Sequence, residues 1–349
     1  MTGSPFVSII MAVRNEAGFI ARSLAAVLAQ DYPSERTEII IADGGSDDGT
    51  RAIIETLQAE HSNLFLIDNP GKIVSCGLNL ALRQVKGEVI VRIDGHCEIA
   101  PDYVSRCVVH LLADEVDCVG GPVTTVGETY TARVIAAAMS STFGVGGSTF
   151  RVAGEVPAFV DTVPFPGFLR ETIERIGPFD EELVRNQDDE YSYRLRKNGG
   201  RILLTPDIHS RYHSRASLRR LGRQYFEYGF WKVRVLQKHP RQMSGRQFVP
   251  PLFVLTLLLL LATAPFFGTG KILLATGVLA YALVNFSAAV FVARRSGWAL
   301  LPLLPFAFAT IHMAYGLGFL VGVLRFWKRW GDHSTQAAHG KLQEYTSLS

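Results

Sequence analysis

The chain has 349 residues, a formal net charge of +3 and 48% hydrophobic residues, enough for one large domain and a further apolar segment. The small net charge, with no basic run interleaved with aromatics in the first half, argues against a nucleic-acid partner. The cysteines have neither CxxC nor zinc-site spacing, which predicts buried, reduced thiols in the cytosol. The N-terminus lacks the pattern of a cleaved signal peptide, so we expect none.

Strands and helices alternate along the first hundred residues. Phe6 to Glu16 is an apolar strand ending in a polar turn, and residues 17–30 follow with helical spacing of apolar side chains. Thr37 to Thr50 repeats the plan, and a helix then runs to about His61. Residues 63–69 form a third short strand, and a helix through Leu78 and Leu82 follows it. This alternation predicts an α/β fold with a mostly parallel sheet and right-handed crossovers.

The segment Gly87 to Cys97 reads as a buried strand that carries polar side chains at its tip. Its apolar residues are β-branched, as in parallel strands covered by helices, and Arg92 is the one exception. Asp94 and His96 follow with Gly95 between them, so both side chains project to the same side. The pattern fits a metal site, although a plain polar turn would look similar.

Acidic and amide side chains stand at the ends of several strands. Asn15 and Glu16 follow the first strand, Asp43 ends the second, and Asp94 with His96 ends the fourth. Ligands of open parallel sheets bind at the carboxyl ends of the strands, so we expect these groups to converge on a polar ligand with a cation. Each residue could instead cap the following helix. The sequence has neither a GxGxxG fingerprint nor a GxxxxGK[ST] loop, which argues against ordinary dehydrogenases and P-loop enzymes.

Taken together, these motifs resemble family 2 glycosyltransferases of the inverting type. The features are a strand ending in NE, a strand running into ADGGSDDGT, a later Asp-x-His triplet in place of Asp-x-Asp, the segment Phe165 to Leu183, and NQDDEYSYRLRKNGGRI from Asn186. The nearest group in character is the membrane-associated enzymes of succinoglycan-type exopolysaccharide synthesis. The resemblance implies the GT-A nucleotide-diphospho-sugar transferase fold over residues 1–214.

The resemblance also implies residue roles. Asp43 would accept the uracil N–H of a nucleotide sugar, and Asn15 and Glu16 would line its base and ribose. Asp94 and His96 would hold Mg²⁺ or Mn²⁺ against the diphosphate, and histidine in place of the second carboxylate suits Mn²⁺ somewhat better. Two weaker donor-binding candidates are Lys72, which could instead be an exposed loop lysine, and Asn79, which could simply belong to a polar helix face.

Asp188 falls where the family has its catalytic base, with Gln187 in place of the usual Glu. Direct inversion needs one carboxylate to take the proton of the acceptor hydroxyl. Asp189 is the reserve candidate, and Glu190 would organise the site. Without the resemblance, the three acids would read as a solvated helix start, since acidic residues suit a helix N-terminus.

The C-terminal third predicts membrane attachment. Residues 215–247 mix basic and aromatic side chains, as in an interfacial helix. We expect a transmembrane region over 248–330, with spans at about 249–267, 272–293 and 298–324, and a polar tail over 331–349. Prolines and a histidine interrupt the third span, and basic residues follow it, so it could be re-entrant or interfacial instead. The positive residues place the catalytic domain in the cytosol, in a multi-pass inner-membrane protein.

The resemblance implies transfer of one sugar from a UDP-sugar, with UDP-glucose as the best guess, to a polyprenyl diphosphate-linked glycan or another membrane-presented acceptor. The expected partners are therefore the nucleotide sugar, the lipid-linked acceptor and the bilayer. The alternatives are a polyprenyl-phosphate glycosyltransferase and a nucleotide-binding membrane scaffold with weak catalysis. A nucleotidyltransferase would ordinarily carry a glycine-rich N-terminal loop with a basic residue, where this chain has VRNE.

Overall fold

The computed structural model describes residues 4–113, 115–146, 156–214 and 217–332; the predicted polar tail therefore lies outside the described residues from position 333 onward. The chain divides into two compact units. The first holds residues 4–124 and 156–212 of the described chain, and the second holds 125–146 and 213–332. The stretch 125–146, inside the expected 1–214 domain, thus groups with the C-terminal helices.

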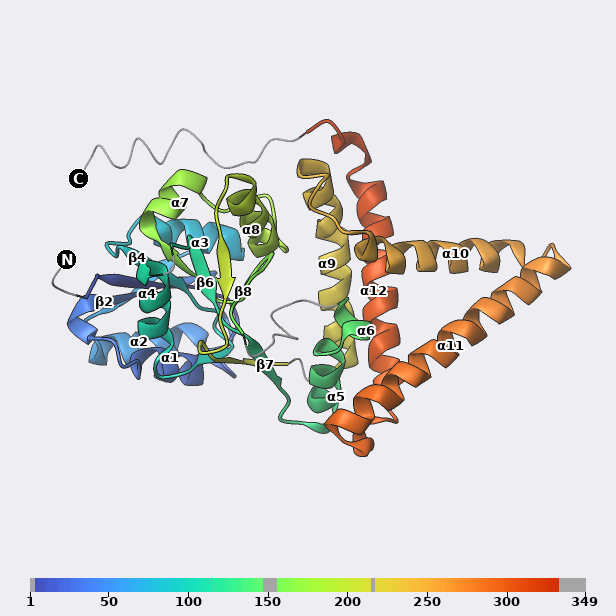
Figure 1. The fold of residues 1–349 in the computed structure, drawn as a ribbon, viewed down its shortest axis with the longest axis horizontal. Coiled ribbons are helices and arrows are strands. Elements are labelled where there is room, and N and C mark those ends of the chain that lie inside the picture. The colour runs from blue at the N-terminus through green and yellow to red at the C-terminus, as the bar shows by residue number, and fades with distance from the viewer. Residues whose placement is uncertain (1–3, 114, 147–155, 215–216, 333–349) are drawn as a thin grey trace. The chain divides into compact units, whose positions relative to one another are not determined.

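The first unit is built on a mixed sheet flanked by helices (Figure 1). Within the described residues this sheet has eight strands in the order β3-β2-β1-β4-β9-β6-β10-β8. Its strands are β1 (Val7–Val13), β2 (Thr37–Asp43), β3 (Leu64–Asp68), β4 (Val89–Arg92), β6 (Cys118–Gly120), β8 (Ala158–Phe159), β9 (Gly167–Leu169) and β10 (Ile202–Leu204). Strands β1 to β4 pair in parallel, whereas β9 runs antiparallel between β4 and β6.

The helices of this unit follow the predicted alternation. They are α1 (Ile20–Leu28), α2 (Thr50–Glu60), α3 (Val74–Leu82), α4 (Tyr103–Ala113), α7 (Arg170–Ile176) and α8 (Gln187–Lys197), with a short 3-10 turn η1 (Ser34–Arg36). Strand β5 (Cys97–Ile99) pairs antiparallel with β11 (Ser210–His213), and β7 (Val123–Val126) leads out of the unit. The mostly parallel α/β fold expected from the sequence is confirmed in the four leading strands.

The core explains why these strands are so apolar. Alternate residues of β1, such as Ile9 and Met11, join Ile41 and Val91 in one buried cluster with side chains of α1, α2 and α4. Ile10, which points the other way, is also buried, because helices cover both faces. A parallel sheet buried on both faces needs such continuous apolar runs. Buried polar residues therefore lie near the strand ends: Ser8 and Glu38 near the starts of β1 and β2, and the candidate site at and beyond the carboxyl ends of the strands.

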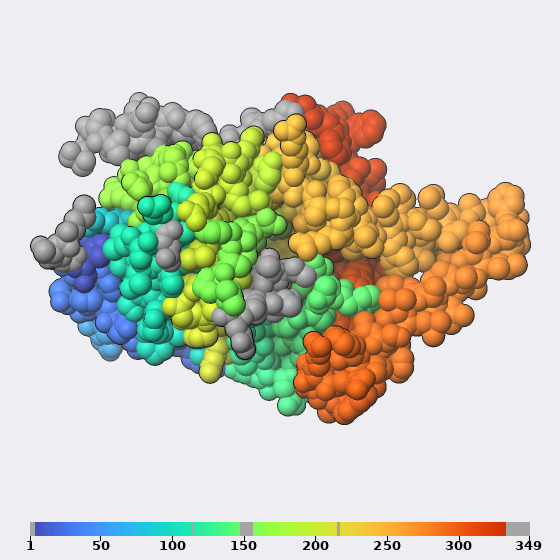
Figure 2. All heavy atoms as spheres, viewed as in Figure 1, coloured from blue at the N-terminus to red at the C-terminus, as the bar shows by residue number. Residues whose placement is uncertain are grey.

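The second unit is mainly helical. Its elements are α5 (Tyr130–Met139), α6 (Thr142–Val145), α9 (Leu218–Lys238), α10 (Val249–Thr263), α11 (Gly268–Ser296) and α12 (Leu304–Arg325), with short turns η3 (Gly245–Phe248), η4 (Trp298–Leu300) and η5 (Trp327–Arg329). In the described chain, three helical stretches are long and apolar enough to cross a membrane: Gly245–Thr263, Gly268–Ser296 and Leu304–Arg325. In Figure 2, α10 and α11 (orange) have much of their surface uncovered.

Candidate active site

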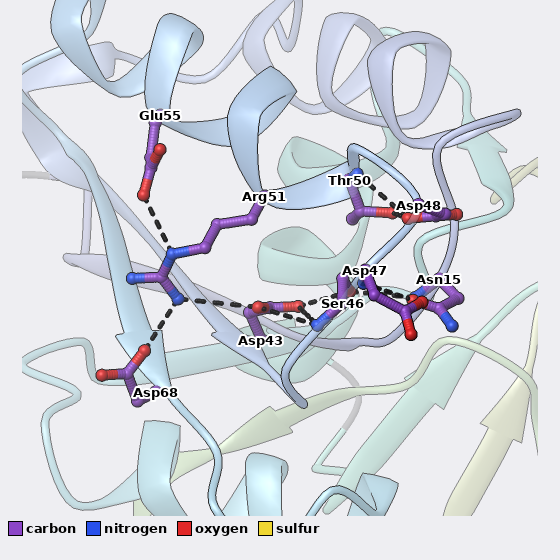
Figure 3. A network of polar contacts seen from close by, with 9 residues as sticks. All are labelled: Asn15, Asp43, Ser46, Asp47, Asp48, Thr50, Arg51, Glu55 and Asp68. Carbon is purple, nitrogen blue, oxygen red and sulfur yellow. Dashed lines mark hydrogen bonds and ion pairs between the residues drawn. The ribbon is translucent and has the colours of Figure 1, made fainter.

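The turns after β1 and β2 are joined by a hydrogen-bonded network (Figure 3). The backbone N–H of Asn15 donates to Ser46 Oγ at 2.9 Å, and the N–H of Asp47 donates to Asn15 Oδ1 at 3.0 Å. Asn15 has a positive φ of 57°, a conformation that asparagine tolerates better than most residues. The turn after β1, which carries Asn15, is therefore held in place by the loop that follows β2.

Asp43 anchors the other side of this network. Its carboxylate is fully buried; it accepts the Ser46 hydroxyl at 2.5 Å and lies 3.5 Å from the Arg51 guanidinium. Arg51 also contacts Glu55 and Asp68 (Figure 3). Asp43 thus holds the Gly-Ser-Asp turn in shape.

Asp48 joins the same two turns one step further along. Its carboxylate accepts the N–H of Ala17 at 3.0 Å and the hydroxyl of Thr50 at 2.5 Å, and Thr50 Oγ1 accepts the N–H of Glu16 at 2.8 Å. Slight burial acts to raise the pKa of Asp48, but these hydrogen bonds outweigh it and hold the pKa below its usual value. Asp48 therefore carries a negative charge that positions Glu16.

Glu16 and His96 form a pair at the ends of β1 and β4. Nδ1 of His96 lies 2.9 Å from Glu16 Oε1, and the imidazole meets the Tyr212 ring edge-on at 5.1 Å. Gly95 makes this approach possible, since a Cβ there would lie 2.9 Å from Val13 Cγ1 and 3.2 Å from Glu16 Cγ. Gly95, between the predicted metal ligands Asp94 and His96, thus allows the contact between Glu16 and His96.

Arg92 lies between the predicted metal ligand Asp94 and the predicted catalytic base Asp188. Its side chain is buried, its Nη2 lies 2.7 Å from Asp94 Oδ1, and its Nη1 lies 3.9 Å from Asp188 Oδ2. Burial opposes the charged form of Arg92, but the Asp94 and Asp188 carboxylates outweigh it and raise its pKa. The sequence marked Arg92 only as an exception in an apolar strand. A single arginine in an otherwise apolar strand was the sequence feature that pointed to a residue between two carboxylates.

Charge around Asp94 keeps it ionised. Desolvation acts to raise its pKa, but the positive charge of Arg92, followed by His96 and Arg185, lowers it overall. Arg185 was not singled out from the sequence, because a basic residue in the loop before an acidic helix start looks like an ordinary surface residue.

Asp188 lies at the start of α8, within reach of Arg92. Half of its side chain is exposed (51%), yet the surrounding protein displaces enough water that desolvation raises its pKa, against the lowering effect of Arg92. The neighbouring Asp189 donates its N–H to Asp188 Oδ1 at 2.9 Å. This raised pKa and partial exposure suit a group that exchanges a proton with a ligand.

Three other predicted residues have clear local surroundings. Glu190 is fully buried and pairs with Arg194 through both oxygens, at 2.8 and 3.1 Å. Asn79 is buried and exchanges hydrogen bonds with the Phe179 backbone, at 2.9 Å in each direction. Lys72 is exposed at the loop after β3, with a positive φ of 59°, and a Cβ on Gly45 would lie 3.8 Å from its Cε. Glu190 and Asn79 thus bind protein groups, whereas Lys72 reaches toward the β2 turn.

The donor atoms at the β4 tip fit a divalent cation with few protein ligands. Within the described residues, no group of three or more His, Cys, Asp or Glu side chains is arranged to hold a metal ion. Arg92 contacts Oδ1 of Asp94 and Glu16 contacts Nδ1 of His96, so Asp94 Oδ2 and His96 Nε2 are the donors that the described part offers. A carboxylate behind a ligating histidine is the usual supporting contact, and phosphate oxygens and water commonly complete such sites.

The described acidic and amide groups lie at and after the carboxyl ends of the strands, where ligands of such sheets bind. Residues 8–177 match the model of "Glycosyl transferase family 2". The chain is 32% identical to the succinoglycan biosynthesis protein ExoA of Rhizobium meliloti (strain 1021) over 330 residues, covering 92% of this chain and 96% of that protein. This chain therefore belongs to glycosyltransferase family 2, and it is a glycosyltransferase.

Two further proteins are similar. The dolichyl N-acetyl-alpha-D-glucosaminyl phosphate 3-beta-D-2,3-diacetamido-2,3-dideoxy-beta-D-glucuronosyltransferase of Methanococcus voltae is 29% identical, over 67% of this chain and 74% of that protein. The mannosyltransferase PcManGT from Pyrobaculum calidifontis, solved in complex with GDP-Man and Mn²⁺, has a TM-score of 0.57 at 21% identity, covering 91% of this chain and 88% of that one. The latter likeness confirms the GT-A fold predicted from the sequence.

Proposed function

We propose that this glycosyltransferase moves a single sugar from a UDP-sugar, with UDP-glucose as the first candidate, to a lipid-linked oligosaccharide at the membrane surface, with inversion at the anomeric carbon. The observation that carries the proposal is Arg92, which lies against Asp94 on one side and faces Asp188 on the other. This contact supports one site in which Asp94 would lie beside the leaving diphosphate and Asp188 would take the proton of the acceptor.

On the donor side, we assign the nucleotide to the joined turns after β1 and β2. Asn15, Glu16 and the Asp43 turn would border the base and ribose, and Lys72 would face the diphosphate. Asp94 and His96 would hold Mn²⁺ or Mg²⁺, which when bound stabilises negative charge on the departing nucleoside diphosphate. Asn79 is better explained as a support that ties α3 to residue 179 than as a direct donor contact.

On the acceptor side, we assign Asp188 as the base. Its carboxylate would accept the proton of the acceptor hydroxyl as that oxygen bonds to the anomeric carbon and the bond to the diphosphate breaks. A raised pKa makes the carboxylate a stronger base than a solvent-exposed aspartate. Glu190 would act indirectly, since its pair with Arg194 fixes the first turn of α8. Asp189 remains the reserve candidate.

A membrane-presented acceptor is supported by the three apolar helical stretches and by the relatives. The R. meliloti protein is named for succinoglycan biosynthesis, and the M. voltae enzyme is named for a dolichyl-linked substrate. Arg294 and Arg295 end α11, and basic residues precede α10, so the positive-inside rule places both positions, with the catalytic unit, in the cytosol.

The test is release of nucleoside diphosphate by isolated membranes supplied with a panel of UDP-, GDP- and dTDP-sugars, a lipid extract as acceptor, and Mn²⁺, Mg²⁺ or EDTA. We expect release from one UDP-sugar, dependent on metal and on Asp188. Release from a GDP-sugar alone would overturn the donor assignment. Transfer to polyprenyl phosphate in place of a diphosphate-linked glycan would favour the polyprenyl-phosphate glycosyltransferase alternative.

A further inference from the structure

Helices α9 and α12 pack against each other at very short range. A Cβ on Gly229 of α9 would lie 2.1 Å from the Tyr315 carbonyl oxygen, and one on Gly318 of α12 would lie 2.1 Å from that of Phe226. Gly322 meets the Phe230 carbonyl in the same way, at 2.6 Å. Small residues that let two backbones touch are typical of closely packed helices in membranes. Figure 1 shows the two helices side by side.

The two helices run in the same direction. Near their starts, a Cβ on Gly222 would lie 3.3 Å from Thr310 Cγ2. Toward the other end of α9, the buried Arg234 donates to both the carboxylate and the carbonyl of Asp332, which follows α12, at 2.8 and 2.9 Å. Contacts at both ends in the same order make α9 and α12 a parallel pair. Whatever angle one makes with the membrane, the other makes as well.

Helix α9 is too highly charged to cross a bilayer. A charged residue at the centre of a spanning helix strongly disfavours insertion into the bilayer. Its 21 residues include these charged side chains: Arg219, Arg220, Arg223, Glu227, Lys232, Arg234 and Lys238. Since α12 lies parallel to α9, the charge on α9 argues against a crossing by α12 too.

Helices α10 and α11 have different surroundings. Only 11% of each candidate span is buried within the protein, against 44% of the α12 span. Helix α10 begins where Pro250 and Val254 pack on Gly316, midway along α12, and Figure 1 shows it leaving the α9–α12 pair crosswise. If α10 follows the membrane normal, the pair lies close to the membrane plane.

The uncovered side of α12 fits a position at the lipid surface. Its exposed apolar residues recur at helical spacing along one face, and two exposed tryptophans follow it: Phe306, Leu317, Val321, Leu324, then Trp327 and Trp330. Exposed basic residues stand at the start of α9 and after its end, at Arg219, Arg220, Arg223, Arg241 and Arg246. Apolar stripes beside basic groups, with tryptophan near the headgroups, are typical of helices lying in the interface.

We propose that only α10 and α11 cross the membrane, as a hairpin, and that α9 and α12 lie as a parallel pair in the bilayer surface on the side of the catalytic unit. The exposed α12 stripe enters the acyl boundary, and the basic side chains face lipid phosphates. The inference rests on the membrane attachment of the proposed function. It places the basic end at Arg325, Lys328 and Arg329 on the cytosolic side, as the positive-inside rule favours.

The test is labelling of single introduced cysteines by a membrane-impermeant maleimide, in sealed vesicles of either orientation. The variants are Phe266→Cys between α10 and α11, Trp298→Cys between α11 and α12, Trp330→Cys after α12, and Glu60→Cys in the catalytic unit. All are made in a Cys76→Ser background, because the other native thiols are buried.

We expect Trp330→Cys and Trp298→Cys to be labelled from the same face as Glu60→Cys, and Phe266→Cys from the opposite face. Labelling of Trp330→Cys together with Phe266→Cys would show that α12 crosses and would overturn the proposal. If lipid shields residue 330 from both faces, protease digestion of an epitope tag placed after Ser349 decides the side. Labelling needs no catalysis, so its outcome is independent of the donor and acceptor assignments.

Discussion

Nη2 of Arg92, the last residue of β4, lies 2.7 Å from Oδ1 of Asp94, which stands two residues beyond the end of that strand. Only Ile93 separates the two residues, so the end of β4 brings the cation and the carboxylate together. The same guanidinium faces Asp188, which follows almost a hundred residues later. A single buried charge therefore influences both Asp94, on the proposed donor side, and Asp188, on the proposed acceptor side.

Replacing Arg92 tests this arrangement. Arg92→Met removes the charge that lowers the pKa of both Asp94 and Asp188. The pKa of Asp188 should then rise further, so the acidic limb of the kcat profile moves to higher pH. A shift of one pKa unit corresponds to about 1.4 kcal/mol. The measurement is kcat against pH for Arg92→Met and Arg92→Lys, with Lys expected to recover part of the shift. An unmoved acidic limb in both variants would contradict the assignment.

Asp188→Asn should abolish transfer while leaving donor binding nearly intact. The change removes a base but no proposed contact with the nucleotide, and loss of a general base typically costs about 10²–10⁴ in rate. In the unchanged enzyme, the raised pKa of Asp188 means that kcat falls as pH drops through a range above that of an ordinary aspartate. The measurements are kcat and UDP-sugar affinity by calorimetry, with Asp189→Asn as the matched control. If Asp189→Asn were the inactive variant, the base would be reassigned to it.

Glu16 should tune the metal through His96. Its carboxylate lies 2.9 Å from Nδ1, and loss of such supporting contacts typically costs about 10–100-fold in metal affinity. We expect Glu16→Ala to weaken Mn²⁺ binding in the presence of UDP by that factor, and Glu16→Gln, whose amide oxygen still accepts from Nδ1–H, by less. Mn²⁺ titration followed by electron paramagnetic resonance measures this without turnover. Equal affinities in all three proteins would show that Glu16 has no such part.

The Glu190–Arg194 pair should matter for stability. Arg194 also donates to the carbonyls of Ile176 and Pro178, at 2.8 Å each, so the pair holds α8 against the loop after α7. Breaking a buried pair by removing one partner costs about 3–5 kcal/mol. Glu190→Gln should therefore lower the melting temperature by several degrees. The control is Glu174→Gln, whose exposed pair with Arg170 at 3.0 Å should contribute about 1 kcal/mol or less. Equal melting temperatures for the two variants would contradict the role of Glu190.

The leading half of the fold was predictable because local pattern and position agree there. Apolar runs, glycine-rich turns and polar strand ends between residues 6 and 97 predict parallel strands and the edge where their polar groups meet. Strand β9 was harder, since three residues inserted antiparallel between β4 and β6 leave no periodic pattern. Its place depends on contacts with partners distant in sequence, which local propensity does not encode.

The same distinction between local pattern and distant contacts applies to the site residues. Glu16 and His96 were each identified from their own motif, but their mutual hydrogen bond depends on how closely β1 approaches β4 at Gly95. Asn79 and Glu190 also looked like ligand-facing polar residues. Their burial against Phe179 and Arg194 comes from the packing of α3 and α8, and a residue type alone does not distinguish a ligand contact from an internal one.

The grouping of residues 125–146 with the C-terminal helices has a consequence for protein synthesis. Tyr130 donates to the Ala299 carbonyl and His312 to that of Phe143, each pair 169 residues apart along the chain. When the ribosome has completed residue 212, α5 and α6 have emerged but their helical partners have not. An enzyme shortened to its first 214 residues would keep the apolar side of α5 without those partners, and would be prone to aggregate. A soluble version needs a short linker in place of this excursion as well as removal of the C-terminal helices.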